Sequence, residues 1–215
     1  MLLAIDTSTR FVGIALFDGA QILSENVWFS SNHHTVELAP AVAQTLMRAR
    51  KTVKELQAIS VAIGPGSFTG LRAGIALAKG ISLAAHIPLV GIPTLDVLAV
   101  AQSLLPQPLV AIARAGRGRL AVGRYKVIDN EWRSTKEVEI ISLQDLSQQL
   151  TEPTLVCGEL TGEERRLLGR KRVNVILASP AQCLRRPSFL AELGWRRMQV
   201  GQVDDSARLA PIYVQ

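Results

Sequence analysis

The stretch Gly64-Pro65-Gly66-Ser67-Phe68-Thr69-Gly70 decides the fold, because it joins a predicted strand to a predicted helix. Residues 58–63 before it are apolar and β-prone, and residues 71–86 after it are rich in Ala, Leu and Ile without proline. This order predicts a strand, a glycine-rich turn and a helix. Glycines in such a turn allow close approach of a backbone or a phosphate, and the N–H groups at a helix start can hold an anion.

The composition of the predicted helix indicates a second use for this region. Gly74 and Gly80 lie in its interior, where glycine costs about 1 kcal/mol relative to alanine. A helix that accepts both glycines is expected to approach a neighbour closely. The stretch therefore has two interpretations, an anion cradle or a tight packing surface, and the sequence leaves both open.

The composition is that of a chain with a substantial aliphatic core. Its 215 residues suffice for one large domain or two small ones, with 48% hydrophobic and 20% charged residues. The net charge is +6, and the basic residues gather late in the chain. No aromatic residues are interleaved there to stack on bases, which favours a solvated basic face over a dedicated nucleic-acid groove. That basic cluster consists of Arg165, Arg166, Arg170, Lys171 and Arg172.

Several protein classes do not fit the sequence. The longest apolar run, 71–86, carries Arg72 and Lys79 and is too polar to span a bilayer. The first residues already follow a strand pattern, so we expect no signal peptide and a cytoplasmic protein. Cys157 and Cys183 have no metal or redox spacing, and we expect both to be buried.

The predicted elements repeat one order in the two halves of the chain. Residues 52–55 match a capping box that opens a short helix. The order predicts an α/β protein of two actin-like (ASKHA, ribonuclease H-like) halves, each with a mixed sheet flanked by helices. We place the N-terminal half at 1–105 and a divergent C-terminal half at 106–215, with the boundary at Pro106-Gln107-Pro108. The predicted strands are 2–6, 11–17, 21–29, 58–63, 88–92, 109–113, 120–127, 137–141, 154–157 and 173–177, and the longer helices are 35–50, 69–85, 94–104, 143–150, 163–168 and 189–200.

Nucleotide chemistry would need the turns after the first strand of each half. The first turn, Asp6-Thr7-Ser8-Thr9, lies where actin-like ATPases contact phosphate and metal, so Asp6, Thr7, Gly66 and Ser67 are candidate phosphate contacts. The matching turn, 112–118, has glycines and arginines but no acid, whereas magnesium–phosphate sites use carboxylates. We therefore expect no ATP hydrolysis by this chain alone. Asp6 as a turn cap and Asp6 as a metal ligand remain the alternatives.

No catalytic or metal-binding residue is predicted elsewhere. His33 and His34 are adjacent, so on a helix they would point about 100° apart and not share a metal. Ser67 does not form a Gly-x-Ser-x-Gly elbow, because Thr69 stands at the place of the last glycine.

Four strings of residues resemble the TsaB (YeaZ) family of bacterial tRNA threonylcarbamoyladenosine biosynthesis proteins. They are MLLAIDTST at 1–9, GPGSFTGLRAG at 64–74, GIPTL at 91–95 and PIYV at 211–214. The resemblance implies two actin-like halves and a role in threonylcarbamoylating the adenosine next to the anticodon of tRNAs that read codons starting with A. It implies a non-catalytic subunit that binds and activates a TsaD-like transferase, joined by a TsaE-like ATPase. It implies indirect contact with tRNA, no tightly bound cofactor, and at most a nucleotide at the partner interface.

The resemblance also implies what the chain lacks. TsaD-like paralogues carry a His-x-x-x-His metal pair at positions that correspond to Thr94 and Leu98, neither of which replaces a histidine ligand. TsaB-like chains often open the second half with Asp-Ala-Arg, where this chain has Arg114-Ala115-Gly116. The remaining alternative is an enzyme in its own right, an actin-like ATPase or a metallopeptidase-like protein.

The resemblance places the partner interface on the predicted helices 35–50 and 69–85. The same surface would serve a homodimer when the partner is missing. Packing of these small residues on the chain's own sheet is the other interpretation. The interface residues expected from the resemblance are Leu38, Val42, Leu46, Thr69, Ala73, Ala76, Leu77, Gly80 and Ala84.

Overall fold

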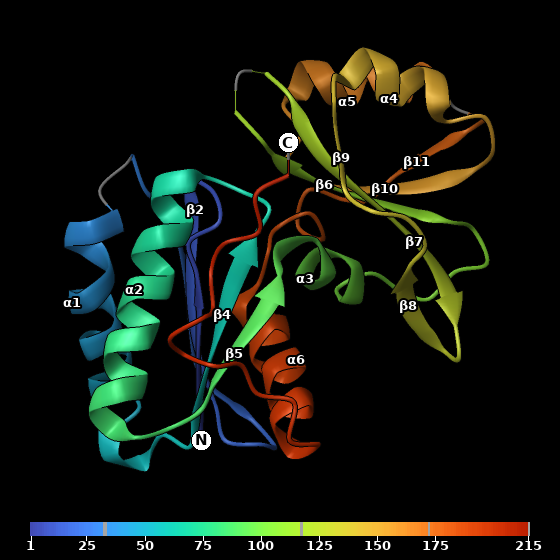
Figure 1. The fold of residues 1–215 in the computed structure, drawn as a ribbon. Coiled ribbons are helices and arrows are strands. Elements are labelled where there is room, and N and C mark those ends of the chain that lie inside the picture. Colours follow the sequence, from blue (N-terminus) through green and yellow to red (C-terminus); the bar gives the residue numbers. More distant parts are fainter. Residues whose placement is uncertain (32–33, 117, 172, 215) are drawn as a thin grey trace. The chain divides into compact units, whose positions relative to one another are not determined.

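The chain forms two compact units, each built on a mixed sheet flanked by helices (Figure 1). The computed structural model describes residues 1–31, 34–116, 118–171 and 173–214. The first unit comprises Met1–Val97 and Arg186–Ile212, and the second comprises Leu98–Arg185 and Tyr213–Gln215. The predicted α/β class and its two mixed sheets are confirmed.

The first unit contains a five-stranded sheet of order β3-β2-β1-β4-β5. Its first three strands form an antiparallel meander, while β4 and β5 continue parallel to β1. Because β1, β4 and β5 are parallel, their carboxyl ends meet at one edge of the sheet. The strands are β1 (Leu2–Asp6), β2 (Phe11–Phe17), β3 (Ile22–Phe29), β4 (Ala58–Gly64) and β5 (Leu89–Pro93).

Helices cover both faces of this sheet. Helices α1 (His34–Arg48) and α2 (Phe68–Ala85) pack on one face, and α6 (Pro187–Gln199) packs on the other (Figure 1). The β1 side chains alternate between two cores, with Leu3 and Ile5 in the core that includes residues of α1 and α2, and Leu2 and Ala4 in the core that includes residues of α6. The central strand is therefore apolar on both faces, which explains its uninterrupted hydrophobic sequence.

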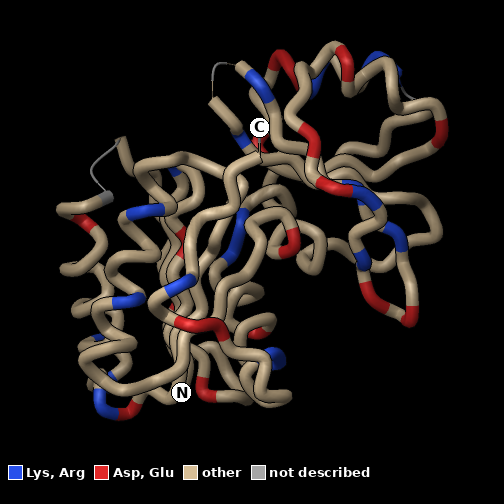
Figure 2. The backbone as a smooth tube through the Cα atoms, in the orientation of Figure 1, with Lys and Arg blue, Asp and Glu red and all other residues tan. Residues whose placement is uncertain are grey.

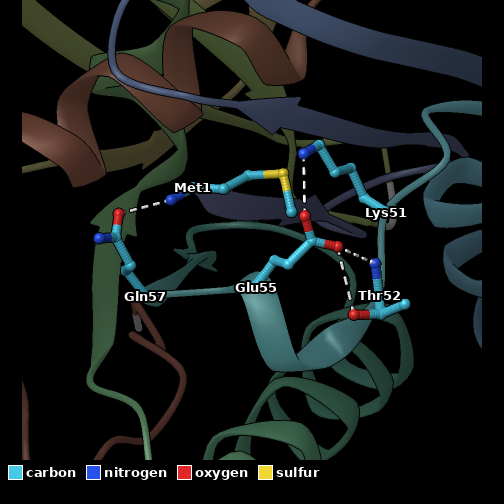
Figure 3. A network of polar contacts seen from close by, with 5 residues as sticks. All are labelled: Met1, Lys51, Thr52, Glu55 and Gln57. Atoms are coloured by element: carbon cyan, nitrogen blue, oxygen red, sulfur yellow. Dashed lines mark hydrogen bonds and ion pairs between the residues drawn. The ribbon is translucent and has the colours of Figure 1, made fainter.

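A small polar network lies around the amino terminus and the segment 51–57 that precedes β4 (Figure 3). The Glu55 carboxylate accepts hydrogen bonds from the backbone N–H and the hydroxyl of Thr52 at 2.8 and 3.2 Å and pairs with Lys51 at 2.8 Å. The amino terminus donates to Gln57 Oε1 at 2.5 Å. The predicted capping box therefore opens a short 3-10 helix, η1 (Val53–Glu55), as expected.

The second unit contains a sheet of order β11-β10-β6-β7-β8, in which β9 also pairs with β7. Strands β6, β10 and β11 are parallel, whereas β7 is antiparallel to β6, β8 and β9. One core, with Ile112, Val156, Leu146 and Leu168 at its centre, packs α4 and α5 on this sheet. The elements are β6 (Leu109–Arg114), β7 (Leu120–Ile128), β8 (Glu131–Ser134), β9 (Glu139–Ile141), α4 (Leu143–Gln149), β10 (Thr154–Gly158), α5 (Gly162–Gly169) and β11 (Val175–Leu177), and α3 (Thr94–Val100) crosses from the first unit.

The observed division differs from the one expected at residues 105 and 106. The last helix, α6, returns to the first unit, where Leu190 and Ala191 pack on β1 and its neighbours. Strand β8 was not expected, and α3 ends at Val100 rather than at residue 104. Among the helices of the described chain, none has both the length and the apolar character that crossing a membrane requires.

Candidate functional site

The turn after β1 and the glycine turn after β4 form one buried hydroxyl cluster. Ser8 Oγ lies 2.8 Å from Thr94 Oγ1, and Gly64 N–H donates to Thr94 Oγ1 at 3.1 Å. Thr7 Oγ1 donates to Gly70 O at 2.7 Å, and Ser67 N–H donates to Ser8 O at 2.6 Å. Three chain segments that follow parallel strands are thereby joined at the carboxyl edge of the sheet.

The glycines of this region are required by close contacts within the unit. A Cβ on Gly66 would lie 2.2 Å from Ser8 O, and a Cβ on Gly74 would lie 2.2 Å from Thr7 Oγ1. Both distances are far below any real Cβ contact. The glycine turn and the first turns of α2 therefore lie directly on the β1–β2 turn.

The space that an anion would need is occupied by these contacts. Ser67 caps α2 by accepting from Gly70 N–H, and its own N–H is bonded to Ser8 O. Asp6 is buried and accepts from Ser8 N–H at 2.8 Å, the interaction of a turn-capping aspartate. Of the four candidate phosphate contacts, Asp6 and Thr7 are buried, Gly66 is half-buried and Ser67 is exposed. The structure supports tight packing over an anion cradle.

The matching turn of the second unit carries an ion pair instead of a phosphate site. Arg114, at the end of β6, makes a bidentate pair with Glu164 in the first turn of α5. Beyond Arg114, Ala115 N–H donates to Arg119 O at 3.1 Å, and Arg119 N–H donates to Gly116 O at 2.9 Å. As the sequence indicated, the turn itself contains no acidic residue. The carboxylate that pairs with Arg114 is that of Glu164, which belongs to α5.

Replacing Glu164 by glutamine is expected to make the free energy of unfolding fall less steeply as the pH is lowered below neutral. The Arg114 hydrogen bonds lower the pKa of Glu164 below the ordinary value of 4.5. A lowered folded-state pKa gives stabilisation that is complete well above pH 4.5 and fades as the pH falls through the folded pKa. The pair is partly solvated, so we expect at most about 1 kcal/mol at pH 7. Urea unfolding between about pH 3 and pH 7 measures it, with exposed Glu163→Gln as control, and parallel curves would contradict the prediction.

Three of the expected interface residues lie in the core. Leu38, Val42 and Leu46 of α1 are 2, 5 and 6% exposed and belong to the core beneath α1 and α2. Their helical spacing marks the face that α1 buries against its own sheet, so their assignment to a partner interface was wrong. The outward residues of α1 include Val36 and Met47, which are 72 and 69% exposed.

The remaining interface residues follow the outward side of α2. Thr69, Ala76, Gly80 and Ala84 are exposed, and Ala73 and Leu77 are half-buried. Two large exposed residues on the same helix were not expected, Phe68 at 52% and Leu83 at 63%. The guanidinium carbon of Arg72 lies 3.7 Å from the centroid of the Phe68 ring.

Gly80 differs from Gly74 on the same helix. Apart from the backbone of its own helix, no described atom lies within 4 Å of the place of a Cβ on Gly80. Gly74 is explained by its contact with Thr7, whereas nothing in the described part of this unit requires glycine at position 80.

Two residues of the basic cluster at 165–172 make hydrogen bonds within the second unit. Arg165 donates to Ala178 O at 2.7 Å, and Lys171 donates to Ser147 O. Arg166 and Arg170 are exposed, and Arg172 lies outside the described residues. Figure 2 shows acidic residues between the basic ones along the chain.

Thr94 and Leu98, the two positions that the resemblance aligns with a metal-binding pair, lie in the interior. Thr94 is fully buried with its hydroxyl bonded to Ser8 and Gly64, and Leu98 is fully buried. Within the described ranges, no group of three or more His, Cys, Asp or Glu is placed to hold a metal ion. His33 and the side chain of His34 lie outside the described residues.

Known proteins resemble this chain in sequence. The family model "TsaD: tRNA N6-adenosine threonylcarbamoyltransferase" matches residues 28–164. The tRNA threonylcarbamoyladenosine biosynthesis protein TsaB of Bacillus subtilis (strain 168) is 32% identical over 219 residues, which cover 97% of this chain and 94% of that protein.

Solved structures resemble it in fold. YeaZ from Pseudomonas aeruginosa superposes with a TM-score of 0.80 at 22% identity and covers 99% of both chains. The ethanolamine utilization protein EutJ from Carboxydothermus hydrogenoformans has a TM-score of 0.55 at 15% identity over 89% of each chain. These likenesses show an actin-like fold, as the order of elements predicted.

Proposed function

The chain belongs to the TsaB family of tRNA threonylcarbamoyladenosine biosynthesis proteins, and we propose that it acts there as a non-catalytic partner of a TsaD-like transferase. The single observation that carries the proposal is the buried hydroxyl cluster. Thr94 stands where the paralogue has a metal-binding histidine, and its hydroxyl is held by Ser8 and Gly64. An aliphatic side chain, Leu98, fills the other metal position, so the metal chemistry belongs to the partner.

The closed glycine turn supports the same conclusion against the alternative of an ATPase. The carbonyl of Ser8 and the hydroxyl of Thr7 occupy the space next to Gly66 and Gly74. A nucleotide phosphate needs N–H groups that point into free space, whereas the N–H groups of Ser67 and Gly70 are already bonded. Both arguments support binding, rather than catalysis, as the contribution of this chain.

The outward side of α2 is the proposed contact with the transferase. Ala76, Gly80 and Ala84 are small and exposed, and exposed Phe68 and Leu83 lie toward the two ends of the helix. Gly80 destabilises an isolated helix by about 1 kcal/mol and meets no neighbour in the described unit, so we attribute it to a partner helix that approaches closely. Aromatic residues at such surfaces often contribute much of the binding energy.

Reconstituted tRNA threonylcarbamoylation tests this function. The mixture contains tRNA, the cognate TsaD-like transferase, a TsaE-like ATPase and the enzyme that makes threonylcarbamoyl-adenylate, with and without this chain. We expect activity to require the chain, and Ala76→Arg with Gly80→Arg to lower both activity and transferase binding at least about tenfold, because two charges would have to be buried.

The matched control is Val173→Arg, at a position in the second unit that is 82% exposed. Activity that does not depend on the chain would overturn the partner role. Activity that depends on the chain but survives the double substitution would overturn the α2 interface alone.

A further inference from the structure

The charges of the first unit are divided unevenly along its chain. Residues 34–86, which form α1, η1, β4 and α2, contain six lysines and arginines but only two acidic residues. The rest of the unit, 1–33, 87–97 and 186–212, contains five basic and seven acidic residues. The helical layer of α1, η1 and α2 on one face of the sheet is therefore basic. Its six cations are Arg48, Arg50, Lys51, Lys54, Arg72 and Lys79.

The two acids of this layer leave most of its positive charge in place. Glu55 pairs with Lys51 at 2.8 Å. Glu37 accepts a hydrogen bond at 2.9 Å from the indole N–H of Trp28, which is a neutral donor. Lys79 donates at 3.2 Å to a backbone carbonyl of the C-terminal segment, and this neutral acceptor does not cancel its charge. The cations of the layer that are exposed to solvent are Arg48, Lys54 and Arg72.

These exposed cations lie toward the two ends of the outward side of α2. The helix itself contains no acidic residue, and Figure 2 shows basic bands along it. Arg72 lies near its start, one turn after Phe68. Strands β3 and β4 both run toward the carboxyl edge of the sheet, so α1 and α2 both run away from it. Lys54 of η1, which follows α1 and packs on α2, therefore lies toward the Leu83 end.

The Arg72 guanidinium is placed to bind a carboxylate. Its central carbon lies 3.7 Å from the centroid of the Phe68 ring, so the ring supports one side of the planar group. A guanidinium held in this way presents a fork of N–H donors that matches the two oxygens of a carboxylate, and little side-chain freedom is lost when they bind.

The residues between the cations favour a protein partner over RNA. Ala76 and Gly80 are exposed in the middle of α2. Neither side chain can stack on a base or donate to a phosphate, which are the contacts that unpaired RNA uses. An apolar centre with cations toward both ends is complementary to a protein surface that is apolar in the middle and acidic at its ends.

We propose that the TsaD-like transferase meets this layer with such a surface, and that it places one carboxylate opposite Arg72 and further acidic groups opposite the segment around Lys54. The inference rests on the function proposed above and adds the chemistry of the partner surface to it. Complementary charges at an interface speed association and reject wrong partners more than they add affinity. Acidic groups toward both ends of α2 would also fix the orientation in which the two proteins bind.

The association rate of the full chain with the cognate transferase, measured by stopped flow, tests the proposal. We expect it to fall about tenfold between about 50 and about 500 mM NaCl, because salt screens the charges. At the lowest salt, Arg72→Glu and Lys54→Glu should each lower it about tenfold, and Arg72→Gln should lower it less. The matched control is Arg166→Glu, the same charge change at an exposed position on α5, and it should change the rate less than about twofold.

A charge swap identifies the partner group of Arg72. Single Asp→Lys or Glu→Lys substitutions in the transferase are combined with Arg72→Glu, and one of them should restore the native association rate. The same transferase variant should not restore binding of Lys54→Glu, because the two cations lie toward opposite ends of α2. Both side chains are exposed, and thermal unfolding of each variant shows whether the fold is kept.

Three outcomes would overturn the acidic partner surface. An association rate that ignores salt and both charge reversals would overturn it while leaving the proposed function intact. A native chain that does not bind the transferase would overturn both. Salt-sensitive binding of tRNA to the isolated chain, lost in Arg72→Glu and Lys54→Glu while both still bind the transferase normally, would assign the basic layer to RNA instead.

Discussion

Replacing Gly74 by alanine is expected to lower the free energy of unfolding by about 2–3 kcal/mol, although alanine is the better helix former. The added methyl group would meet Thr7 Oγ1 at 2.2 Å. Thr7 is fully buried and its hydroxyl is bonded to Gly70 O, so the side chain cannot turn away without losing that hydrogen bond. Either α2 or the β1–β2 turn would have to shift, and both carry the buried cluster with Ser8 and Thr94.

Gly80 supplies a matched control on the same helix. The same change there meets no described neighbour and should raise the unfolding free energy by up to about 1 kcal/mol. Urea unfolding of both variants measures the two effects, and a similar change of stability at both sites would contradict the prediction. Under the proposed function, Gly80→Ala should also weaken transferase binding. The same variant would then be more stable but bind the transferase less tightly.

The order of elements could be predicted from the sequence because local patterns determine it. The uninterrupted apolar run of β4 and the glycine turn after it predicted a strand, a turn and a helix, and the structure contains all three. Strand β8 was not predicted, because Glu131–Ser134 contains a single apolar residue, Trp132, and therefore shows no alternation of apolar and polar residues. Its pairing with β7 depends on backbone hydrogen bonds across a hairpin, which side-chain periodicity does not report.

The place of α6 could not be predicted in the same way. An amphipathic helix shows which of its sides is buried, but its sequence does not say against which sheet. Position in the chain suggested the second half, whereas Leu190 and Ala191 fill the open face of the first sheet. The Glu25 carboxylate also binds the start of this helix through Arg186 and Ser188, a contact between residues more than 160 positions apart.

The predictions for the candidate site were partly correct for the same reason: sequence patterns show which side of an element is buried, but not what covers it. The spacing of Leu38, Val42 and Leu46 correctly marked one side of α1, but that side faces the core. The glycine turn allowed an anion cradle or close packing, and the choice required the position of Ser8 O, which belongs to another strand end. A usable signal was present in the hydroxyl residues Ser8 and Thr94, because each follows a strand of the parallel set.

Glu159→Gln is expected to lower the unfolding free energy of the second unit by about 3–5 kcal/mol. Glu159 follows β10 and pairs with Arg185, whose side chain is 1% exposed, while that of Glu159 is 15% exposed. The substitution leaves the buried guanidinium without this carboxylate, and removing one partner of a buried ion pair is strongly destabilising in folded domains. Solvent-exposed pairs behave differently, so Glu131→Gln, which breaks the pair with Arg133, should cost less than about 1 kcal/mol.

A double-mutant cycle distinguishes the lost charge pair from lost packing. Arg185→Met removes the buried charge, so Glu159→Gln should cost much less in that background than in the native chain. Chemical denaturation of the four proteins, followed by a probe in the second unit such as the buried indole of Trp132, gives the coupling free energy. Additive costs for the two substitutions would contradict the prediction, because they would mean that Arg185 and Glu159 stabilise the unit independently. A coupling of about 2 kcal/mol or more would show that the ion pair fixes the segment before α6 to the residues that follow β10.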